Sequence, residues 1–303
     1  MGVNGLKEYG LTFEIANCQR ETPFVFSAHS SIGCGGFART AYYPETVESL
    51  QSLIKALKEK DVPFYVVGNM TNVLPPDGES RRVFIVTKRL AQTDIDNGYF
   101  GAGVTSGALL RACRSAHKSG AEFLAGIPCT LGGALYMNAG AAGVYISEIV
   151  ESVTVLRGEN ILVLPVCDCR YAYKTSVFMQ NDDVILGGKL RLKTADDETI
   201  KQETSRFLER RKHLPKGKSM GCVFKNPDNP DNPDGATAGK LIDGAGLKGL
   251  RIGGAKVAEE HANFIINDKN ATSAEIRTLI GIIKNAVFAQ YKIRLQEEIR
   301  YLT

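Results

Sequence analysis

A cysteine in the C-terminal third of the chain is the first residue that could do acid–base chemistry. Cys222 follows Gly221 and precedes the strand-like pair Val223 and Phe224, with Lys225 next. A thiol at the entry of a strand can donate a proton, and a nearby ammonium group could modulate its acidity. The alternative is a buried apolar cysteine, which is what most cysteines are. The local sequence leaves both interpretations open.

Charged residues elsewhere could act beside such a thiol. Lys174 and Arg170 lie in the hydroxyl-rich segment Cys169–Phe178 and could contact an acidic substrate, although a solvated strand edge has the same composition. Glu298 lies on the polar face of the final alternating segment, where a solvated carboxylate is the simpler interpretation. His261 could be a ligand or a base.

Two glycine-rich segments could line a cofactor. The loop from Gly68 to Asn72 follows a buried apolar run, and such a turn can expose backbone N–H groups that cradle a diphosphate. The stretch from Ala125 to Gly140 contains Gly126, Gly132 and Gly133, whose bare backbone can line a flat ring system. The alternatives are a tight turn and a small-residue packing segment.

Length and composition limit the class of protein. A chain of 303 residues is long enough for two or three domains, and 44% hydrophobic with 23% charged residues is typical of a folded protein. A net charge of +4 is too mild to indicate a nucleic-acid surface. The basic stretch 206–218 could clamp phosphates or be a solvated helix face. Residues 123–147 carry no charge, but their glycines disfavour a lipid-facing helix.

The cysteines and histidines indicate a reduced protein without a metal site. The seven Cys are an odd number and include no C-x-x-C pair, and the four His include no pair at i, i+4 spacing. The first ten residues lack the apolar run of a signal peptide. We therefore expect a cytoplasmic protein with free thiols, no metal and no membrane segment.

Hydrophobic spacing predicts the elements that position these segments. Helices are expected over Pro44–Lys60, Thr105–Lys118 and Thr199–Lys212, and from the capping box of Thr272 and Glu275 to Tyr291. Strands are expected over Val62–Val67, Val83–Val86, Val153–Leu156, Ile161–Leu164, Ser176–Phe178, Val184–Leu192 and Ile293–Leu302. The four strands between residues 153 and 192 indicate a small, largely antiparallel sheet. Three tandem Asn-Pro-Asp copies at 226–234 indicate an exposed loop.

Five motifs give the chain a resemblance to a known family. They are AGIPCTLGGALYMNAGA, CRYAYKTSVF, GCVFKNP, AGKLIDGAGLKGLRIGGAKV and EEHANFIIN, in this order. With them the chain resembles the UDP-N-acetylenolpyruvoylglucosamine reductases, also called UDP-N-acetylmuramate dehydrogenases, from about Thr40 to Arg300. The short spacing before Cys169 resembles the shorter of the family's two subtypes.

The resemblance implies a fold, a cofactor and a substrate. The fold class is α+β, with a two-part FAD-binding domain of the vanillyl-alcohol-oxidase type and a C-terminal α+β substrate domain. We expect FAD-binding subdomains at 1–86 and 87–200 and a substrate domain at 201–303, its last strand free to return to the first subdomain. NADPH is the implied reductant and a UDP-sugar the implied substrate. We expect a monomer or weak oligomer that binds no nucleic acid.

The implied reaction converts UDP-N-acetylglucosamine enolpyruvate to UDP-N-acetylmuramate for peptidoglycan synthesis. NADPH reduces FAD, hydride passes from flavin N5 to the enolpyruvyl methylene carbon, and a protein acid protonates the neighbouring carbon. Cys222 occupies the position of the family's usual Ser acid, and a thiol is protonated at neutral pH. Glu298 matches a family Glu. Lys174 stands where the family has an Arg, so the charge is kept but the two-pronged guanidinium is lost, unless Arg170 helps.

The resemblance also implies which residues contact the ligands. It assigns the cofactor to Gly68, Asn69, Met70, Thr71, Asn72, Gly126, Ile127, Pro128, Thr130, Gly132, Gly133 and Asn138. It assigns the substrate to Tyr173, Arg210, Lys225, Asn226 and His261. Two places depart from the family pattern: the loop at 68–72 lacks one Gly of the usual G-x-G-S-N, and Ser30–Gly36 lacks an Arg.

Two other functions stay open. Another flavoprotein with the same cofactor fold, such as an oxidase, would give no reason for GCVFKNP or EEHANFIIN. A non-catalytic or altered-specificity paralogue that binds a flavin or a UDP-sugar is favoured by the altered motifs, Lys174 above all.

Overall fold

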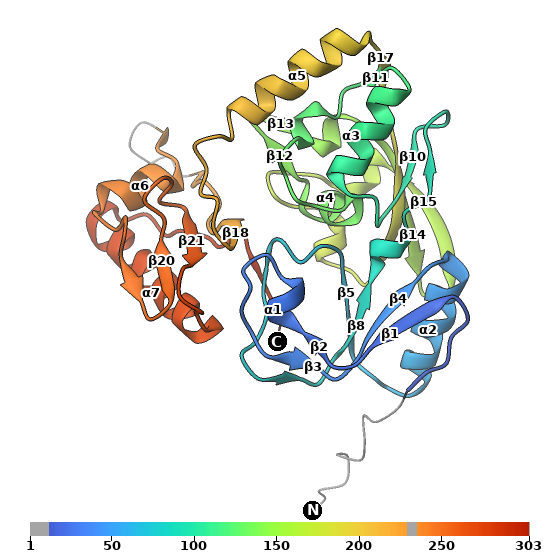
Figure 1. Ribbon diagram of the computed structural model, residues 1–303, viewed down its shortest axis with the longest axis horizontal. Helices are drawn as coiled ribbons and strands as arrows, with labels where there is room; N and C mark the ends of the chain where they lie inside the picture. The colour runs from blue at the N-terminus through green and yellow to red at the C-terminus, as the bar shows by residue number, and fades with distance from the viewer. Residues whose placement is uncertain (1–11, 229–234, 303) are drawn as a thin grey trace, which may run out of the picture.

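The computed structural model describes residues 12–228 and 235–302 (Figure 1). Helices and strands are mixed along the chain, and most strand pairs are antiparallel, so the predicted α+β class is confirmed. Most of the predicted Asn-Pro-Asp loop at 226–234 lies outside the described residues.

The N-terminal sheet carries the first glycine loop. Strand β8 is parallel to β4 and β5, while β1 is antiparallel to β4. The loop at 68–72 leaves the end of β5. Strand β5 begins after Pro63, two residues later than predicted, because proline has no N–H for a ladder. The sheet order is β1 (Cys18–Glu21), β4 (Ala41–Pro44), β8 (Val83–Val86) and β5 (Phe64–Val67).

Helix α2 (Val47–Glu59) covers this sheet with Leu50, Leu53 and Leu57. Pro44, predicted at or just before the first turn, ends β4, and Thr46 caps the helix. The Thr46 hydroxyl accepts a hydrogen bond from the Ser49 N–H at 3.1 Å, and the Ser49 hydroxyl accepts one from the Thr46 N–H at 3.2 Å. Thr46 is therefore the N-cap, and Val47 is the first residue of the helix.

A smaller sheet and an aromatic cluster complete the N-terminal part. Phe24, Phe26 and Phe84 are buried, with ring centroids 5.1–5.9 Å apart. The added elements are β2 (Phe24–Val25), α1 (Phe26–His29), β3 (Phe37–Ala38) and β7 (Glu79–Ser80).

The second sheet carries the second glycine segment, and all its strand pairs are antiparallel, where a largely antiparallel sheet is predicted. Its order is β15 (Asn160–Pro165), β14 (Val150–Arg157), β16 (Val184–Leu190), β10 (Tyr99–Gly101) and β9 (Thr93–Asp94). Helix α4 packs on β16, where a Cβ on Gly188 would lie 3.0 Å from Leu135. The remaining elements are α3 (Ser106–Ser115), α4 (Leu131–Met137), β11 (Lys118–Ser119), β17 (Lys193–Thr194), β12 (Gly140–Ala141) and β13 (Val144–Tyr145).

The strand predicted over Ser176–Phe178 is wrong. Residues Val177–Met179 form a 3₁₀ turn. The Ser176 hydroxyl donates to the Tyr136 carbonyl at 2.6 Å, and Phe178 is buried against Tyr171. These contacts hold the segment against the core, and it does not pair with a neighbouring strand. Phe178 is therefore buried without being part of a strand.

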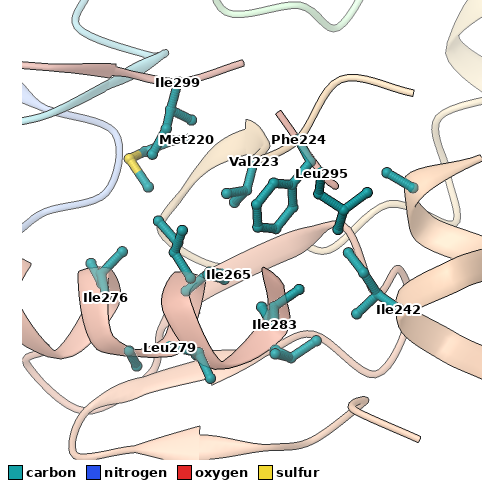
Figure 2. Packing of buried hydrophobic residues seen from close by; sticks show 14 of the residues in the cluster. Met220, Val223, Phe224, Ile242, Ile265, Ile276, Leu279, Ile283, Leu295 and Ile299 are labelled. Atoms are coloured by element: carbon teal, nitrogen blue, oxygen red, sulfur yellow. The ribbon is translucent and has the colours of Figure 1, made fainter. Parts of the chain in front are cut away.

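The C-terminal part has its own sheet and core. Helix α5 (Asp197–Glu209) leads into the C-terminal part. Figure 1 shows this part, in orange to red, beside the two earlier sheets. In Figure 2, Met220, Val223 and Phe224 point towards Ile276 and Ile283 of the last helix. The predicted capping box of Thr272 and Glu275 is confirmed. The elements are β18 (Ser219–Cys222), β21 (Phe264–Asn267), β20 (Ala255–Val257), β19 (Arg251–Ile252), α6 (Ala238–Gly244) and α7 (Ser273–Tyr291).

The last segment connects the C-terminal part to the N-terminal one. Ile293, Leu295 and Ile299 are buried on one face, as the alternation predicts. A regular strand, however, is limited to β22 (Arg300–Tyr301), which pairs in parallel with β6 (Val73–Leu74).

Two side chains also bridge these parts of the chain. The Asn267 amide donates to the carbonyls of Ile32 and Gly33, each at 3.0 Å, and the Asp77 carboxylate accepts from the N–H groups of Ser273 and Ala274 at the start of α7.

Candidate active site

The backbone at Cys222 is shaped by a bulge. Strand β18 pairs with β21, and its register shifts between Ser219 and Cys222. Gly221 has φ +77°, a conformation that a residue with a Cβ rarely adopts. A bulge re-aims the side chain that follows it, so Gly221 sets the direction of the Cys222 thiol.

Lys174 and Glu298 form a largely buried ion pair. The Lys174 Nζ lies 2.9 Å from the Glu298 Oε1, with the side chains 17% and 12% exposed. Lys174 occupies the left-handed region, with φ +51°, inside a turn whose ends, Ala172 and Thr175, exchange both backbone hydrogen bonds. The solvated carboxylate that the polar face of the last segment suggested is therefore wrong for Glu298.

The Cys222 thiol lies in the field of this pair. Burial and, to a smaller extent, the charge of Glu298 raise the pKa of Cys222 to about 12, although Lys174 and Arg211 oppose the shift. Burial acts to lower the pKa of Lys174, but the charge of Glu298 and the hydrogen bond to it outweigh burial, and the pKa is raised. The structure thus brings the three predicted catalytic residues together, with a neutral thiol beside an ammonium–carboxylate pair.

Asn263 fixes the chain just after Cys222, and the sequence reasoning missed it. Its Oδ1 accepts from the Phe224 N–H at 2.9 Å and its Nδ2 donates to the Phe224 carbonyl at 2.8 Å. Its own carbonyl accepts from the Val223 N–H at 2.8 Å. Asn263 lies in the motif EEHANFIIN, so the sequence did point to this segment. The functional role there was, however, assigned to His261.

The other side of the same segment is held by the chain end. The Glu298 N–H donates to the Val223 carbonyl and the Lys225 N–H donates to the Gln296 carbonyl, both at 2.8 Å. The Asn72 amide donates to the Glu298 carbonyl at 3.2 Å. Cys222 and Glu298 are therefore set relative to each other by a short ladder of backbone bonds, and the 68–72 loop contacts that ladder through Asn72.

Three of the predicted substrate residues lie next to Lys174. The Tyr173 hydroxyl accepts from the Asn226 N–H at 3.1 Å, and the Lys225 Nζ lies 3.5 Å from the Thr175 Oγ1. Tyr173 is 39% exposed. These side chains form a polar rim from which a substrate could be bound.

Arg210 and His261 are placed differently. Arg210 is exposed at the end of α5, and it is the next residue, Arg211, whose charge acts on Cys222. The His261 ring stacks near His213, with centroids 6.5 Å apart, and burial followed by the charge of His213 lowers the pKa of His261. Within the described residues, neither Arg210 nor His261 makes a hydrogen bond to Cys222. Arg170 is exposed and lies outside the Lys174–Glu298 pair.

The two predicted cofactor segments meet. A Cβ on Gly68 would lie 2.2 Å from the Thr130 Oγ1, and the Asn69 amide donates to the Pro128 carbonyl at 2.8 Å. Within the described residues, the backbone N–H groups of Asn69, Met70 and Thr71 donate to no protein acceptor. Free N–H groups on a glycine turn are suited to a diphosphate.

The second segment is braced by its neighbours. The N–H groups of Leu131 and Gly132 donate to the Val104 and Ala102 carbonyls at 2.8 and 2.9 Å, so the start of α4 has no free donors there. The Ile127 carbonyl accepts from the Ser106 hydroxyl. Asn138, 3% exposed, donates to the Ala172 carbonyl at 2.8 Å and so links this segment to the Lys174 turn.

These segments fit FAD in two respects. The free N–H groups of the 68–72 loop match the diphosphate, and Gly133 leaves bare backbone, with only the Thr130 Oγ1 within 4 Å of an added Cβ, at 3.5 Å. The rest of the described chain holds no group of three or more His, Cys, Asp or Glu side chains that could bind a metal. Of its helices, none has the length and apolar composition needed to span a bilayer.

Comparisons with known proteins agree on one family. A family model described as "UDP-N-acetylenolpyruvoylglucosamine reductase, C-terminal domain" matches residues 212–302, and one described as "FAD binding domain" matches 38–162. The chain is 35% identical over 279 residues to the reductase of Pelobacter propionicus, covering 90% of this chain and 92% of that one. It is 36% identical over 282 residues to the reductase of Clostridioides difficile, covering 90% of each.

A solved structure agrees with the sequence comparisons. The crystal structure of UDP-N-acetylenolpyruvylglucosamine reductase from Thermus caldophilus is 30% identical and superposes with a TM-score of 0.80, covering 94% of this chain and 99% of that chain. Sequence and fold therefore agree over almost the whole length, and the chain belongs to the UDP-N-acetylenolpyruvoylglucosamine reductase family.

Proposed function

We propose that this chain is an FAD-dependent oxidoreductase that reduces UDP-N-acetylenolpyruvoylglucosamine to UDP-N-acetylmuramate for peptidoglycan synthesis. NADPH is the reductant, and the reaction takes place in the cytoplasm. The observation that carries the proposal is the placement of the Cys222 thiol beside the buried pair of Lys174 and Glu298. Family membership over 90% of the chain supports it independently.

The proposal assigns FAD to the two glycine segments. The 68–72 loop would hold the diphosphate with its free N–H groups, and the 126–133 segment would lie along the rest of the cofactor. When bound, FAD supplies the hydride that the enolpyruvyl methylene carbon receives. We propose 1–86 and 87–200 as the FAD-binding subdomains and 201–303 as the substrate domain, in a monomer or weak oligomer.

Cys222 delivers the proton to the carbon next to the methylene. The raised pKa keeps the thiol protonated at neutral pH, so the acid is available before the substrate arrives. Negative charge that develops on the substrate carboxylate is stabilised by the Lys174 ammonium, which Glu298 holds in place. Tyr173, Lys225 and Asn226 orient the substrate from the rim.

Consumption of NADPH by purified, FAD-loaded protein tests this function, measured with and without UDP-N-acetylglucosamine enolpyruvate. We expect consumption that depends on the substrate. Cys222→Ala should abolish it, whereas removing the exposed Cys167 as Cys167→Ala should leave it unchanged. FAD binding without any stimulation by substrate would contradict the reductase and favour a paralogue with the same fold.

A further inference from the structure

Arg211 carries a positive charge for which the described protein offers no counter-ion. The side chain is half-buried, just beyond the end of α5. Within residues 12–228 and 235–302, no carboxylate lies at ion-pair distance from its guanidinium, and the guanidinium makes no hydrogen bond. The neighbouring cations Arg206 and Lys212, in contrast, pair with Glu203 and Glu209. A partly buried guanidinium costs free energy unless an anion accompanies it, so this arrangement points to a ligand.

The position of Arg211 is fixed by the second glycine segment. A Cβ on Gly126 would lie 3.1 Å from the Arg211 Nε and 3.2 Å from its Cδ. Gly126 also has φ +75°. Glycine is therefore required here both for the backbone and for the room that Arg211 occupies. Arg211 also lies close enough to Cys222 and Cys129 for its positive charge to act to lower the pKa of both thiols.

The chemistry of the site indicates which anion this is. In the enolpyruvyl group, the carbon that receives the proton also bears the carboxylate. A cation next to the proton donor therefore lies next to that carboxylate, whereas the diphosphate of the same substrate lies across the sugar ring. Lys174 is already paired with Glu298 and is a point charge that cannot bind both oxygens of a carboxylate.

We propose that Arg211 binds the substrate's enolpyruvyl carboxylate with its two parallel N–H donors, supplying the bidentate contact that position 174 lacks. The proposal rests on the proposed function, because it names a contact to that substrate. Arg211, and not its exposed neighbour Arg210, is then the arginine that reaches the reacting part of the ligand. Bidentate pairing adds geometric specificity as well as free energy, so the contact would also orient the double bond.

The test uses FAD-loaded protein and two ligands that differ only in the enolpyruvyl group. Binding of UDP-N-acetylglucosamine enolpyruvate and of UDP-N-acetylglucosamine is followed by competition and by perturbation of the flavin absorbance, without NADPH. Arg211→Gln should weaken the enolpyruvyl ligand on the order of 10- to 100-fold, the size expected for a hydrogen bond to a charged group, and leave UDP-N-acetylglucosamine unchanged. Arg211→Lys should be intermediate. Arg114→Gln, which removes an exposed arginine far along the chain, controls for net charge.

The outcomes separate this contact from others. Equal weakening of both ligands would place Arg211 on the diphosphate and overturn the proposal, as would loss of FAD from Arg211→Gln with unchanged substrate affinity. A loss of enolpyruvyl binding in Arg210→Gln instead of Arg211→Gln would also overturn it. If wild-type protein binds neither ligand, the proposed function itself fails. If the wild type binds the enolpyruvyl ligand and the Arg211→Gln variant binds it equally well, the Arg211 proposal alone fails.

Discussion

The ammonium of Lys174 and the carboxylate of Glu298 lie 2.9 Å apart; they come from a turn between β15 and β16 of the second sheet and from the last segment of the chain. Both side chains are largely withdrawn from water. The pair therefore links two distant parts of the sequence at the point where the Cys222 thiol lies, and neither charge is well accommodated without the other.

Removing one partner of this pair should cost both stability and activity. Lys174→Gln leaves the Glu298 carboxylate buried without a counter-charge, and we expect a loss of about 3 kcal/mol in the free energy of unfolding. Urea denaturation measures it. The double variant Lys174→Gln with Glu298→Gln should recover part of the stability but not the activity. A single variant as stable as the wild type would show that the pair is not desolvated.

Restoring the family's guanidinium is a separate prediction. Lys174→Arg keeps the charge opposite Glu298 and adds a second donor direction. We expect folding and FAD retention to be kept and substrate-dependent turnover to change less than tenfold, because Arg211 already supplies bidentate binding. A rise in kcat/KM well beyond tenfold would mean that the lysine limits this chain and that Arg211 does not compensate.

The Cys222 thiol should resist alkylation over the physiological pH range. Burial raises its pKa to about 12, and a raised pKa favours the protonated thiol, so the reactive thiolate amounts to on the order of one part in a thousand at about pH 9. Iodoacetamide labelling followed by peptide mass spectrometry, compared with exposed Cys167, measures this. Lys174→Gln should slow labelling further, because the ammonium lowers the thiol pKa. Labelling of Cys222 at pH 7 as fast as Cys167 would contradict the assignment.

Asn263 should act on the reaction by positioning Cys222. Asn263→Asp keeps the shape but removes the donor to the Phe224 carbonyl, and a buried group left without its partner costs roughly 1–3 kcal/mol. We expect kcat to fall on the order of tenfold, with a smaller change in KM, and Cys222 labelling to shift along the pH axis. Asn97→Asp, at an exposed turn, is the matched control. A loss of stability with unchanged kcat would make Asn263 purely structural.

The contact between the two glycine segments predicts a defect in cofactor binding. In Gly68→Ala the new methyl would lie 2.2 Å from the Thr130 Oγ1, so the 68–72 loop must move away from the second segment. We expect weaker FAD retention, seen as lower flavin absorbance per protein after gel filtration. Gly78→Ala has open space around the new methyl and should retain FAD as the wild type does.

Local sequence signals predicted elements better than they predicted contacts. The Thr272 capping box and the alternation from Ile293 to Ile299 are properties of a few neighbouring residues, and both appear in the structure. The strand at Ser176–Phe178 failed because a side-chain bond to the Tyr136 carbonyl, remote in sequence, decides its conformation.

In the candidate site, too, local sequence identified residues but not the contacts between them. Ordered motifs selected Cys222, Lys174 and Glu298, but the sequence alone could not reveal that Lys174 and Glu298 pair, because more than a hundred residues separate them. Nor could it choose Arg211 over Arg210, since the choice depends on where α5 ends and on the space above Gly126. The motif EEHANFIIN contained Asn263, but its role lies in hydrogen bonds to the backbone of Val223 and Phe224, which only the structure shows.

Separating the two half-reactions in Cys222→Ala tests the central claim most directly. The FAD-loaded variant is mixed with NADPH in a stopped-flow instrument, and the flavin absorbance is followed before and after addition of UDP-N-acetylglucosamine enolpyruvate under anaerobic conditions. If Cys222 supplies only the proton, the flavin should bleach at the wild-type rate and then fail to recover, whereas Cys222→Ser should recover it at a measurable rate. Recovery in Cys222→Ala at the wild-type rate would contradict the account.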